Sequence, residues 1–205
     1  QPSSIVTSKV HPKNLPALCG SCHENPELTK RHKFLRDKPV ASYSISVHAK
    51  AIEDGNDQAA TCNDCHSTNG SAHRILSPGE LNSTINHFAI PKTCGNCHED
   101  VLEEFFESIH GQLVLRGETD APVCTNCHGE HKILSPDDPR SPTSHSRLAQ
   151  AVCAPCHESS FLAEKYGFPL DRLPTYIDSY HGLKSKAGDT TVANCTSCHA
   201  THNIL

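Results

Sequence analysis

Residues 94–134 read CGNCHEDVLEEFFESIHGQLVLRGETDAPVCTNCHGEHKIL, and this stretch contains each motif from which the chain is built. Two Cys-x-x-Cys-His motifs enclose a Ser-Ile-His sequence, and a His-Lys-Ile-Leu sequence follows the second of them. The same order of motifs occurs three times, which indicates an internal repeat. We therefore expect a single domain over residues 1–205, built of three modules that cover about 11–78, 87–136 and 145–205.

The Cys-x-x-Cys-His motif accounts for all twelve cysteines of the chain. Two thiols three residues apart on one helical turn can each form a thioether to one porphyrin, and the histidine that follows binds the iron. Zinc ribbons, disulfides and thioredoxin-like redox pairs also use Cys-x-x-Cys, but none of them requires that histidine. The sequence therefore predicts six covalently bound haem c groups with their irons. Their thioether cysteines are Cys19, Cys22, Cys62, Cys65, Cys94, Cys97, Cys124, Cys127, Cys153, Cys156, Cys195 and Cys198, and their proximal histidines are His23, His66, His98, His128, His157 and His199.

The composition indicates that these haems form the interior. Only 5% of the residues are aromatic and neither Met nor Trp occurs, so the polypeptide alone would bury little apolar surface against the entropy of the chain. We expect a mostly irregular, elongated fold with short α-helices, haems forming the core and almost no β-structure, and an apoprotein that is largely unfolded. The clearest helix covers residues 101–110, with counterparts over 43–52 and 175–181, and such helices are expected to deliver the Ser-x-His histidines from their ends.

Histidine is the expected second axial ligand of every iron. The chain has no Met for this role, and ten histidines remain after the six proximal ones. The histidines of the Ser-x-His motifs lie fourteen residues before the next motif cysteine, and we assign them to the second haem of each module: His48, His110 and His181. The first haem takes either the closing histidines of the His-x-Ile-Leu sequences (His73, His131 and His202) or the upstream histidines (His11, His87 and His145). We favour the closing set, and we expect the remaining histidine, His32, at the surface.

Irons with two histidine ligands have no position for a substrate, so we expect electron transfer at low potential and no enzymatic activity. A nitrite- or sulfite-type reductase would need a five-coordinate haem, which is often marked by a Cys-x-x-Cys-Lys motif, and the chain has none. If a closing histidine instead ligated the first haem of the next module, His202 would have no iron left in its own chain. It would then reach a neighbouring subunit, and such head-to-tail contacts produce a filament when they do not close into a ring.

The repeat CGNCHED…ESIHG…CTNCHGEHKIL, with YGFPLDRLPTYIDSYHG in the third module, resembles the doubled-CxxCH multihaem cytochromes of the cytochrome c3 and c7 class. The resemblance covers essentially the whole chain. It implies closely stacked haems with two histidine ligands each, and a role in periplasmic or extracellular electron transfer during anaerobic respiration. Module 1 departs from the pattern by a four-residue insertion before His73 and by Ala49, where the other modules have Gly.

The net charge of −5, without a basic stripe or an apolar run of membrane-spanning length, argues against a nucleic-acid partner and a membrane span. Haem c is attached outside the cytoplasmic membrane, and the polar segment after Gln1 is typical of a mature N-terminus after export. We expect an extracellular or cell-surface protein, with the periplasm as the alternative, and redox proteins or further copies of this chain as partners. The expected function is an electron conduit; a soluble carrier or a haem subunit of a membrane oxidoreductase is the alternative.

Overall fold

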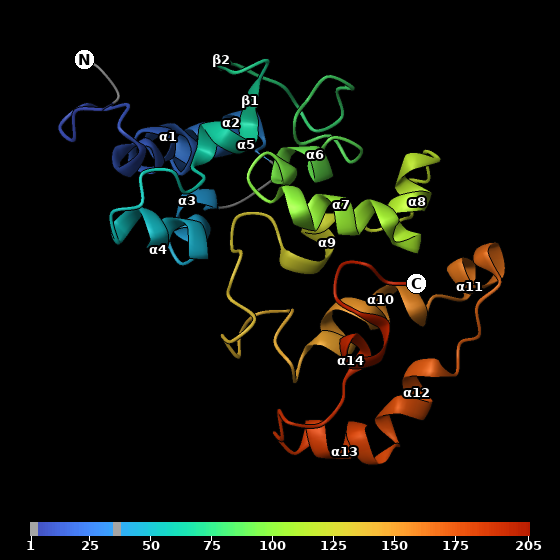
Figure 1. Cartoon of the computed structure of the whole chain (residues 1–205). Coiled ribbons are helices and arrows are strands. Elements are labelled where there is room, and N and C mark those ends of the chain that lie inside the picture. The colour runs from blue at the N-terminus through green and yellow to red at the C-terminus, as the bar shows by residue number, and fades with distance from the viewer. Residues whose placement is uncertain (1–3, 35–37) are drawn as a thin grey trace. The chain divides into compact units, whose positions relative to one another are not determined.

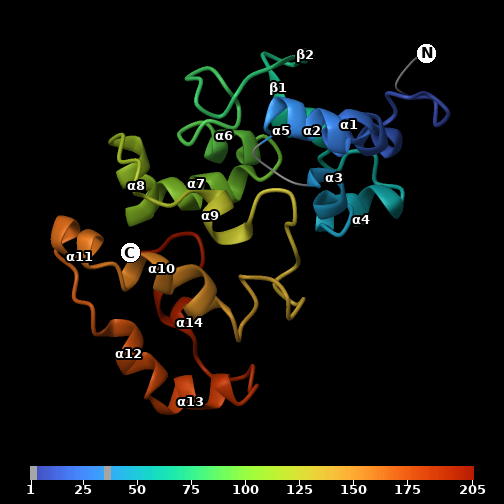
Figure 2. The same ribbon diagram turned by 180° about the vertical axis from the view of Figure 1, so that it is seen from behind.

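The computed structural model describes residues 4–34 and 38–205, and helices are its dominant secondary structure (Figure 1). The described residues hold one small sheet of two strands, so the expected short α-helices with little β-structure are confirmed. The chain divides into two compact units: unit 1 comprises Gln1–Ala89 with Gly129–Leu134, and unit 2 comprises Ile90–His128 with Ser135–Leu205. Figure 2 shows the same elements from behind. The single elongated domain of three modules stays a prediction.

Unit 1 consists of short helices and a β-hairpin. The helical elements are η1 (Pro12–Asn14), α1 (Leu15–His23), α2 (Pro26–His32), α3 (Pro39–Tyr43), α4 (Val47–Glu53) and α5 (Cys62–His66). Strands β1 (Ser67–Thr68) and β2 (Ser71–Ile75) pair antiparallel through the insertion of module 1. Asn69 and Gly70 join them with φ of 55° and 69°, which is the positive-φ pair of a type I′ hairpin turn. The hairpin projects from the side of unit 1 that lies away from α4 (Figure 1).

Unit 2 is helical throughout its described elements. They are α6 (Ile90–Gly95), α7 (Glu99–Glu107), α8 (Ile109–Leu115), α9 (Cys124–His128), the π-helical turn η2 (Ala149–Cys153), α10 (Ala154–His157), α11 (Ser160–Tyr166), α12 (Arg172–Ile177), α13 (Tyr180–Lys186) and α14 (Cys195–His199).

The histidine of each Ser-x-His motif lies at the second residue of a helix. Helix α7 ends before Ser108, whose backbone is extended (φ −70°, ψ 160°), and α8 begins directly after it. The Ser108 hydroxyl accepts a hydrogen bond from the Gly111 N–H (3.0 Å), which is the N-cap interaction. Ser46 and Ser179 cap α4 and α13 in the same way. The expected continuous helices over 101–110, 43–52 and 175–181 are therefore wrong, because a capping serine starts a new helix two residues before each histidine.

The glycine after the Ser-x-His histidine is required by close packing in modules 2 and 3. A Cβ atom on Gly111 would overlap the carbonyl oxygen of Phe105, and one on Gly182 would overlap that of Tyr176. We expect Gly111→Ala to destabilise the holoprotein by about 1–3 kcal/mol, because backbone atoms cannot move aside as a flexible side chain can. The melting temperature measures this loss.

Module 1 provides the matched control, because Ala49 occupies the same position there. The change Ala49→Gly should cost about 1–2 kcal/mol, because it places a glycine inside a helix and removes a buried methyl group. Equal melting temperatures for Gly111→Ala and the unchanged protein would contradict the packing argument.

A polar residue inside the second Cys-x-x-Cys-His motif of each module fixes the start of its helix. Its side chain accepts a hydrogen bond from the N–H of the residue before the first cysteine. These bonds join Asp64 to Thr61 (2.7 Å), Asn126 to Val123 (2.8 Å) and Ser197 to Asn194 (3.0 Å). The cap begins the helix at the first cysteine, so both cysteines and the histidine lie on one short helix.

The closing segments, which are residues 73–76, 131–134 and 202–205, contain the His-x-Ile-Leu sequences. Two of them dock on a helix of the preceding module. The Ile133 carbonyl accepts a hydrogen bond from the Val47 N–H at the start of α4 (2.8 Å), and the Ile204 carbonyl accepts one from the Ile109 N–H at the start of α8 (2.9 Å). This exchange explains why Gly129–Leu134 belongs to unit 1, although the residues on either side belong to unit 2.

The apolar interior of each unit is small. Nine apolar residues are buried in the described part of the chain, and three of these are alanines: Ala49, Ala121 and Ala154. Large apolar side chains such as Phe161 (64% exposed) and Leu183 (57% exposed) lie at the surface instead. Side chains of this chain alone therefore supply little of the buried area that stabilises a domain.

Candidate functional site

Three pairs of histidine rings stand out in the described residues. In each pair one ring belongs to a Cys-x-x-Cys-His motif and the other to one of the spare histidines. The ring centres are 6.1 Å apart in His66–His131, 6.1 Å in His128–His202 and 6.3 Å in His110–His157, and the ring planes are inclined by 10°, 27° and 65°. Each pair combines two modules, because the spare histidine comes from the module that follows or precedes the motif.

The separation of these rings suits a metal ion between them. Two imidazole faces in contact would lie about 3.5–4.0 Å apart, so the rings do not stack directly. An imidazole nitrogen binds a metal ion at about 2.0 Å, and two such bonds on opposite sides of one ion place the ring centres about 6.3 Å apart. The observed 6.1–6.3 Å matches this value in all three pairs. The separation therefore leaves room for an ion between the two rings of each pair.

The direction of this pairing differs from the expected one. His110 was assigned to the second haem of its own module, but its ring lies beside His157, in the first motif of the next module. His131 and His202 were assigned to the first haem of their own modules, but they lie beside the second motif histidine of the preceding module. The closing segment that contains His202 docks backward, at the start of α8. Which iron each of these histidines binds stays a prediction.

The surroundings of His66 and His110 favour their neutral form. Burial, followed by the charges of His131 and His23, lowers the pKa of His66. Burial, followed by the charge of His157, lowers the pKa of His110. A neutral imidazole has a free lone pair, which metal binding requires.

The two motif histidines of one module lie near each other. Burial, followed by the charges of His202 and His98, lowers the pKa of His128. Burial, followed by the charge of His199, lowers the pKa of His157.

The closing segment of module 3 also contacts α7, because Glu104 lies 3.6 Å from His202 Nδ1. A carboxylate on the far ring nitrogen orients a ligating histidine.

The cysteines repeat one arrangement in every module, and all twelve are free thiols. The first cysteine of one motif interacts with the first cysteine of the other through a thiol hydrogen bond. These bonds join Cys19 to Cys62, Cys94 to Cys124 and Cys153 to Cys195. The two motif helices of each module therefore lie side by side.

These contacts change the acidity of the thiols. The hydrogen bond from Cys153 lowers the pKa of Cys195 to about 7, and the same bond raises the pKa of Cys153. Burial, followed by the charge and hydrogen bond of Cys19, raises the pKa of Cys62 to about 12. One thiol of a pair therefore loses its proton more readily than the other.

The residues present fit covalent haem. Every motif has two free thiols three residues apart, with a histidine next to the second one. Among residues 4–34 and 38–205, no three His, Cys, Asp or Glu side chains are placed to hold a metal ion on their own. A haem iron needs only two ligands from the protein, and three motif histidines have such a second histidine in place.

The upstream histidines have other contacts. His11 is buried (4% exposed), accepts a hydrogen bond from the Lys13 N–H on Nδ1 (3.2 Å) and lies 3.5 Å from Asp57 through Nε2. The Nε2 atom of His145 is 2.7 Å from the Val192 carbonyl oxygen. These bonds tie the start of a module to the segment before its second motif, which is a structural role.

The other candidate ligands occupy varied positions. His87 is half-buried with its ring edge on Phe88 (5.0 Å), and His48 is half-buried on α4. His98 is exposed after the end of α6. In module 1, the first motif histidine His23 and the closing histidine His73 are also exposed. In module 3, the Ser-x-His histidine His181 and the second motif histidine His199 are exposed.

Comparison of the chain with protein-family models, with curated proteins and with solved structures gives no match. In the described ranges, none of the helices combines the length and apolar character that a membrane crossing requires. The geometry of the histidines and cysteines thus provides the functional argument.

Sequence reasoning missed the residues that position these ligands. Ser46, Ser108 and Ser179 start the helices that carry the Ser-x-His histidines. The serine of the motif was itself the available signal, since serine is a preferred N-cap residue. The isoleucine carbonyls of the closing segments, which dock on these helices, have no comparable local signal.

Proposed function

We propose that this protein transfers electrons through six covalently bound haem c groups, each with two axial histidines. The observation that supports this most strongly is the set of three histidine pairs with ring centres 6.1–6.3 Å apart. When bound, haem iron exchanges single electrons between its ferric and ferrous states.

The residues of the chain would hold the groups and close them to substrates. The motif cysteines provide two thioether anchors for each porphyrin, on the same short helix as the proximal histidine. A second histidine would be the other protein ligand of each iron, so no position would stay open for a substrate. This favours electron transfer over a reductase. The absence of Met from the chain favours low potentials, since Met/His ligation raises them.

The spacing of the sites favours a conduit over six independent centres. The first cysteines of both motifs are hydrogen-bonded in every module, which brings the two anchoring helices together. Between modules 2 and 3, burial followed by the charge of Cys156 raises the pKa of Cys127, so these anchors are also neighbours. We propose an extracellular or periplasmic conduit. A soluble carrier or a haem subunit of a membrane oxidoreductase would use the same sites.

The haem content of the purified protein tests the proposal. Expressed in a host that attaches haem c, the chain should carry six haems by pyridine haemochrome assay and intact mass. The ferric protein should be low-spin at all six irons by electron paramagnetic resonance, because two imidazoles provide a strong ligand field.

The adjacent thiols define the competing outcome. If the cysteines Cys19–Cys62, Cys94–Cys124 and Cys153–Cys195 instead formed disulfides, the mass would contain no haem and six thiols would remain free to alkylate. That result would overturn the proposed function.

A further inference from the structure

We propose that Glu104 is a positioning residue that lowers the reduction potential of the iron held between His128 and His202. The inference rests on the proposed function, because it takes these two histidines as the axial ligands of one haem. It extends that function by making one of the six haems electronically distinct, through a side chain that binds no iron itself.

Helix α7 places the Glu104 carboxylate beside the ring of His202. The Oε2 atom of Glu104 lies 3.6 Å from Nδ1 of His202, and the centre of that ring lies 6.1 Å from the ring centre of His128. Iron binding at Nε2 leaves Nδ1 of the same ring to carry the proton. A movement of about half an ångström would bring the carboxylate to hydrogen-bonding distance of this nitrogen. Glu104 is therefore placed to accept the Nδ1 proton of His202.

Two further contacts hold the segment that contains His202 on the same helices. The Asn203 side chain donates a hydrogen bond from Nδ2 to Oε2 of Glu107, which lies at the end of α7 (3.1 Å). The Ile204 carbonyl accepts a hydrogen bond from the Ile109 N–H at the start of α8 (2.9 Å). Three successive residues of the segment thus contact α7 or α8. The approach of the His202 ring to the carboxylate follows from this docking.

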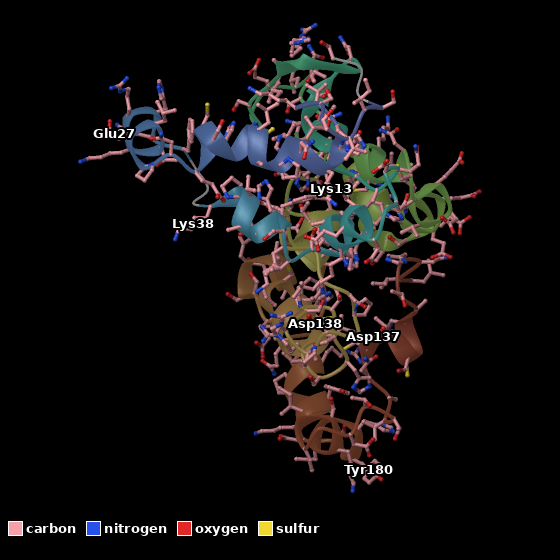
Figure 3. All side chains as sticks on the ribbon, turned by 90° about the vertical axis from the view of Figure 1, so that its left-hand side faces the viewer. Lys13, Glu27, Lys38, Asp137, Asp138 and Tyr180 are labelled. Carbon is pink, nitrogen blue, oxygen red and sulfur yellow. The ribbon has the colours of Figure 1, made fainter. Side chains whose placement is uncertain are left out.

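The negative charge of Glu104 is not balanced by a cation. In the ranges 4–34 and 38–205, no Lys or Arg side chain pairs with this carboxylate. Asp138, which is labelled in Figure 3, shows the opposite case, because the Arg140 guanidinium lies 2.7 Å from its carboxylate. The charge of Glu104 therefore acts on the His202 ring without an opposing charge beside it.

The expected direction of the effect follows from the charge of the iron. A carboxylate on the free nitrogen of an imidazole makes the ring a more basic ligand. Ferric iron carries one positive charge more than ferrous iron, so a more basic ligand and a nearby negative charge stabilise the ferric state more. Reduction becomes less favourable, and the reduction potential falls. Loss of the carboxylate charge should raise it.

A redox titration of the full-length holoprotein with Glu104→Gln tests this effect. Glutamine keeps the size of the side chain and one oxygen acceptor, but it removes the charge. We expect one of the six midpoint potentials to rise and the other five to stay. About a tenfold loss of preference for ferric iron, which corresponds to about 59 mV for a one-electron couple, is the expected size. All six irons should stay low-spin by electron paramagnetic resonance, because His202 is still present.

The matched control is Glu107→Gln. It removes the same charge from the same helix, and Glu107 contacts the same segment, but through Asn203 and not through the histidine. Both variants should change the melting temperature by a similar amount, whereas only Glu104→Gln should raise a midpoint potential. Equal potential shifts in both variants would show a general effect of surface charge, and no shift with Glu104→Gln would show a purely structural role. Either result overturns the proposal.

Removal of one haem identifies the iron that responds. In a background with Cys124 and Cys127 changed to serine, the haem beside His128 is absent, so Glu104→Gln should leave the titration of the remaining five haems unchanged. A potential shift that persists in this background would overturn the proposal. Haem content and mass must first confirm five haems in the background.

The variant His202→Ala separates this inference from the proposed function. It should make one iron high-spin, because it removes an axial ligand. If every iron stays low-spin, the assignment of His202 is wrong and the role of Glu104 fails with it. If one iron becomes high-spin but Glu104→Gln leaves the titration unchanged, only the role of Glu104 is overturned. A purified chain without haem would instead overturn the proposed function itself.

Discussion

Without haem this chain is expected to show no cooperative unfolding transition at all. The described residues bury nine apolar side chains, three of them alanines, and large apolar groups remain at the surface. Such a core offsets little of the conformational entropy of the chain. Expression in a host without haem c attachment should therefore remove essentially the whole folding free energy, typically about 5–15 kcal/mol for a domain.

Far-UV circular dichroism during heating measures this effect, with limited proteolysis as a second readout. The holoprotein should melt in a steep transition and resist protease, whereas the apoprotein should lose ellipticity gradually and be cleaved throughout. The matched control is the holoprotein with the Cys62 and Cys65 pair changed to serine, which should hold five haems and keep a cooperative transition. An apoprotein that melts as steeply as the holoprotein would show that polypeptide packing alone carries the fold.

The second large effect concerns which iron loses a ligand when His110 is removed. In the structure His110 pairs with His157, so His110→Ala should convert the haem at Cys153 and Cys156 to high spin. If that haem is first removed by changing both cysteines to serine, His110→Ala should leave the remaining irons low-spin. The effect on the spin state is then lost completely.

The comparison background lacks the haem at Cys124 and Cys127 instead. There, His110→Ala should still produce one high-spin iron, because His157 keeps its haem. Pairing within one module predicts the reverse, with the effect lost only in this second background. Pyridine haemochrome assays must first show five haems in both backgrounds, so that each spectrum reports ligation and not a failure to attach haem.

Local sequence patterns predicted the motif helices and the general class of the fold. The two cysteines and the histidine of each motif are close enough in sequence to share one helical segment. In the structure each motif lies at or beside a short helix, and its cysteines are free thiols. The short helices and the near absence of β-structure followed from the composition and from the apolar spacing over residues 101–110. Signals for the capping serines and for the Asn69-Gly70 turn were also present in the sequence, and they explain the helix starts and the hairpin.

The choice of partner for each spare histidine depends on contacts between distant segments. His110 and His157 are far apart in sequence, and so are His66 and His131. A constant fourteen-residue spacing to the next cysteine therefore described the repeat, but it did not identify the neighbouring ring. The docking of the Ile133 and Ile204 carbonyls accompanies the pairs that His131 and His202 make, and main-chain carbonyls leave no trace in a sequence pattern.

Because closing segments dock on the preceding module, the chain cannot be divided between these modules without the loss of a backbone contact. A fragment that ends after residue 134 keeps the segment that docks at Val47, but it loses the one that docks at Ile109. Such a fragment therefore leaves the start of α8 without the closing segment that contacts it in the structure. In arrays of this kind stability comes from nearest-neighbour interfaces, so opening begins at such positions and the middle is protected by its neighbours. Length itself then acts as a stabilising element, because each added module turns a frayed end into an interior position.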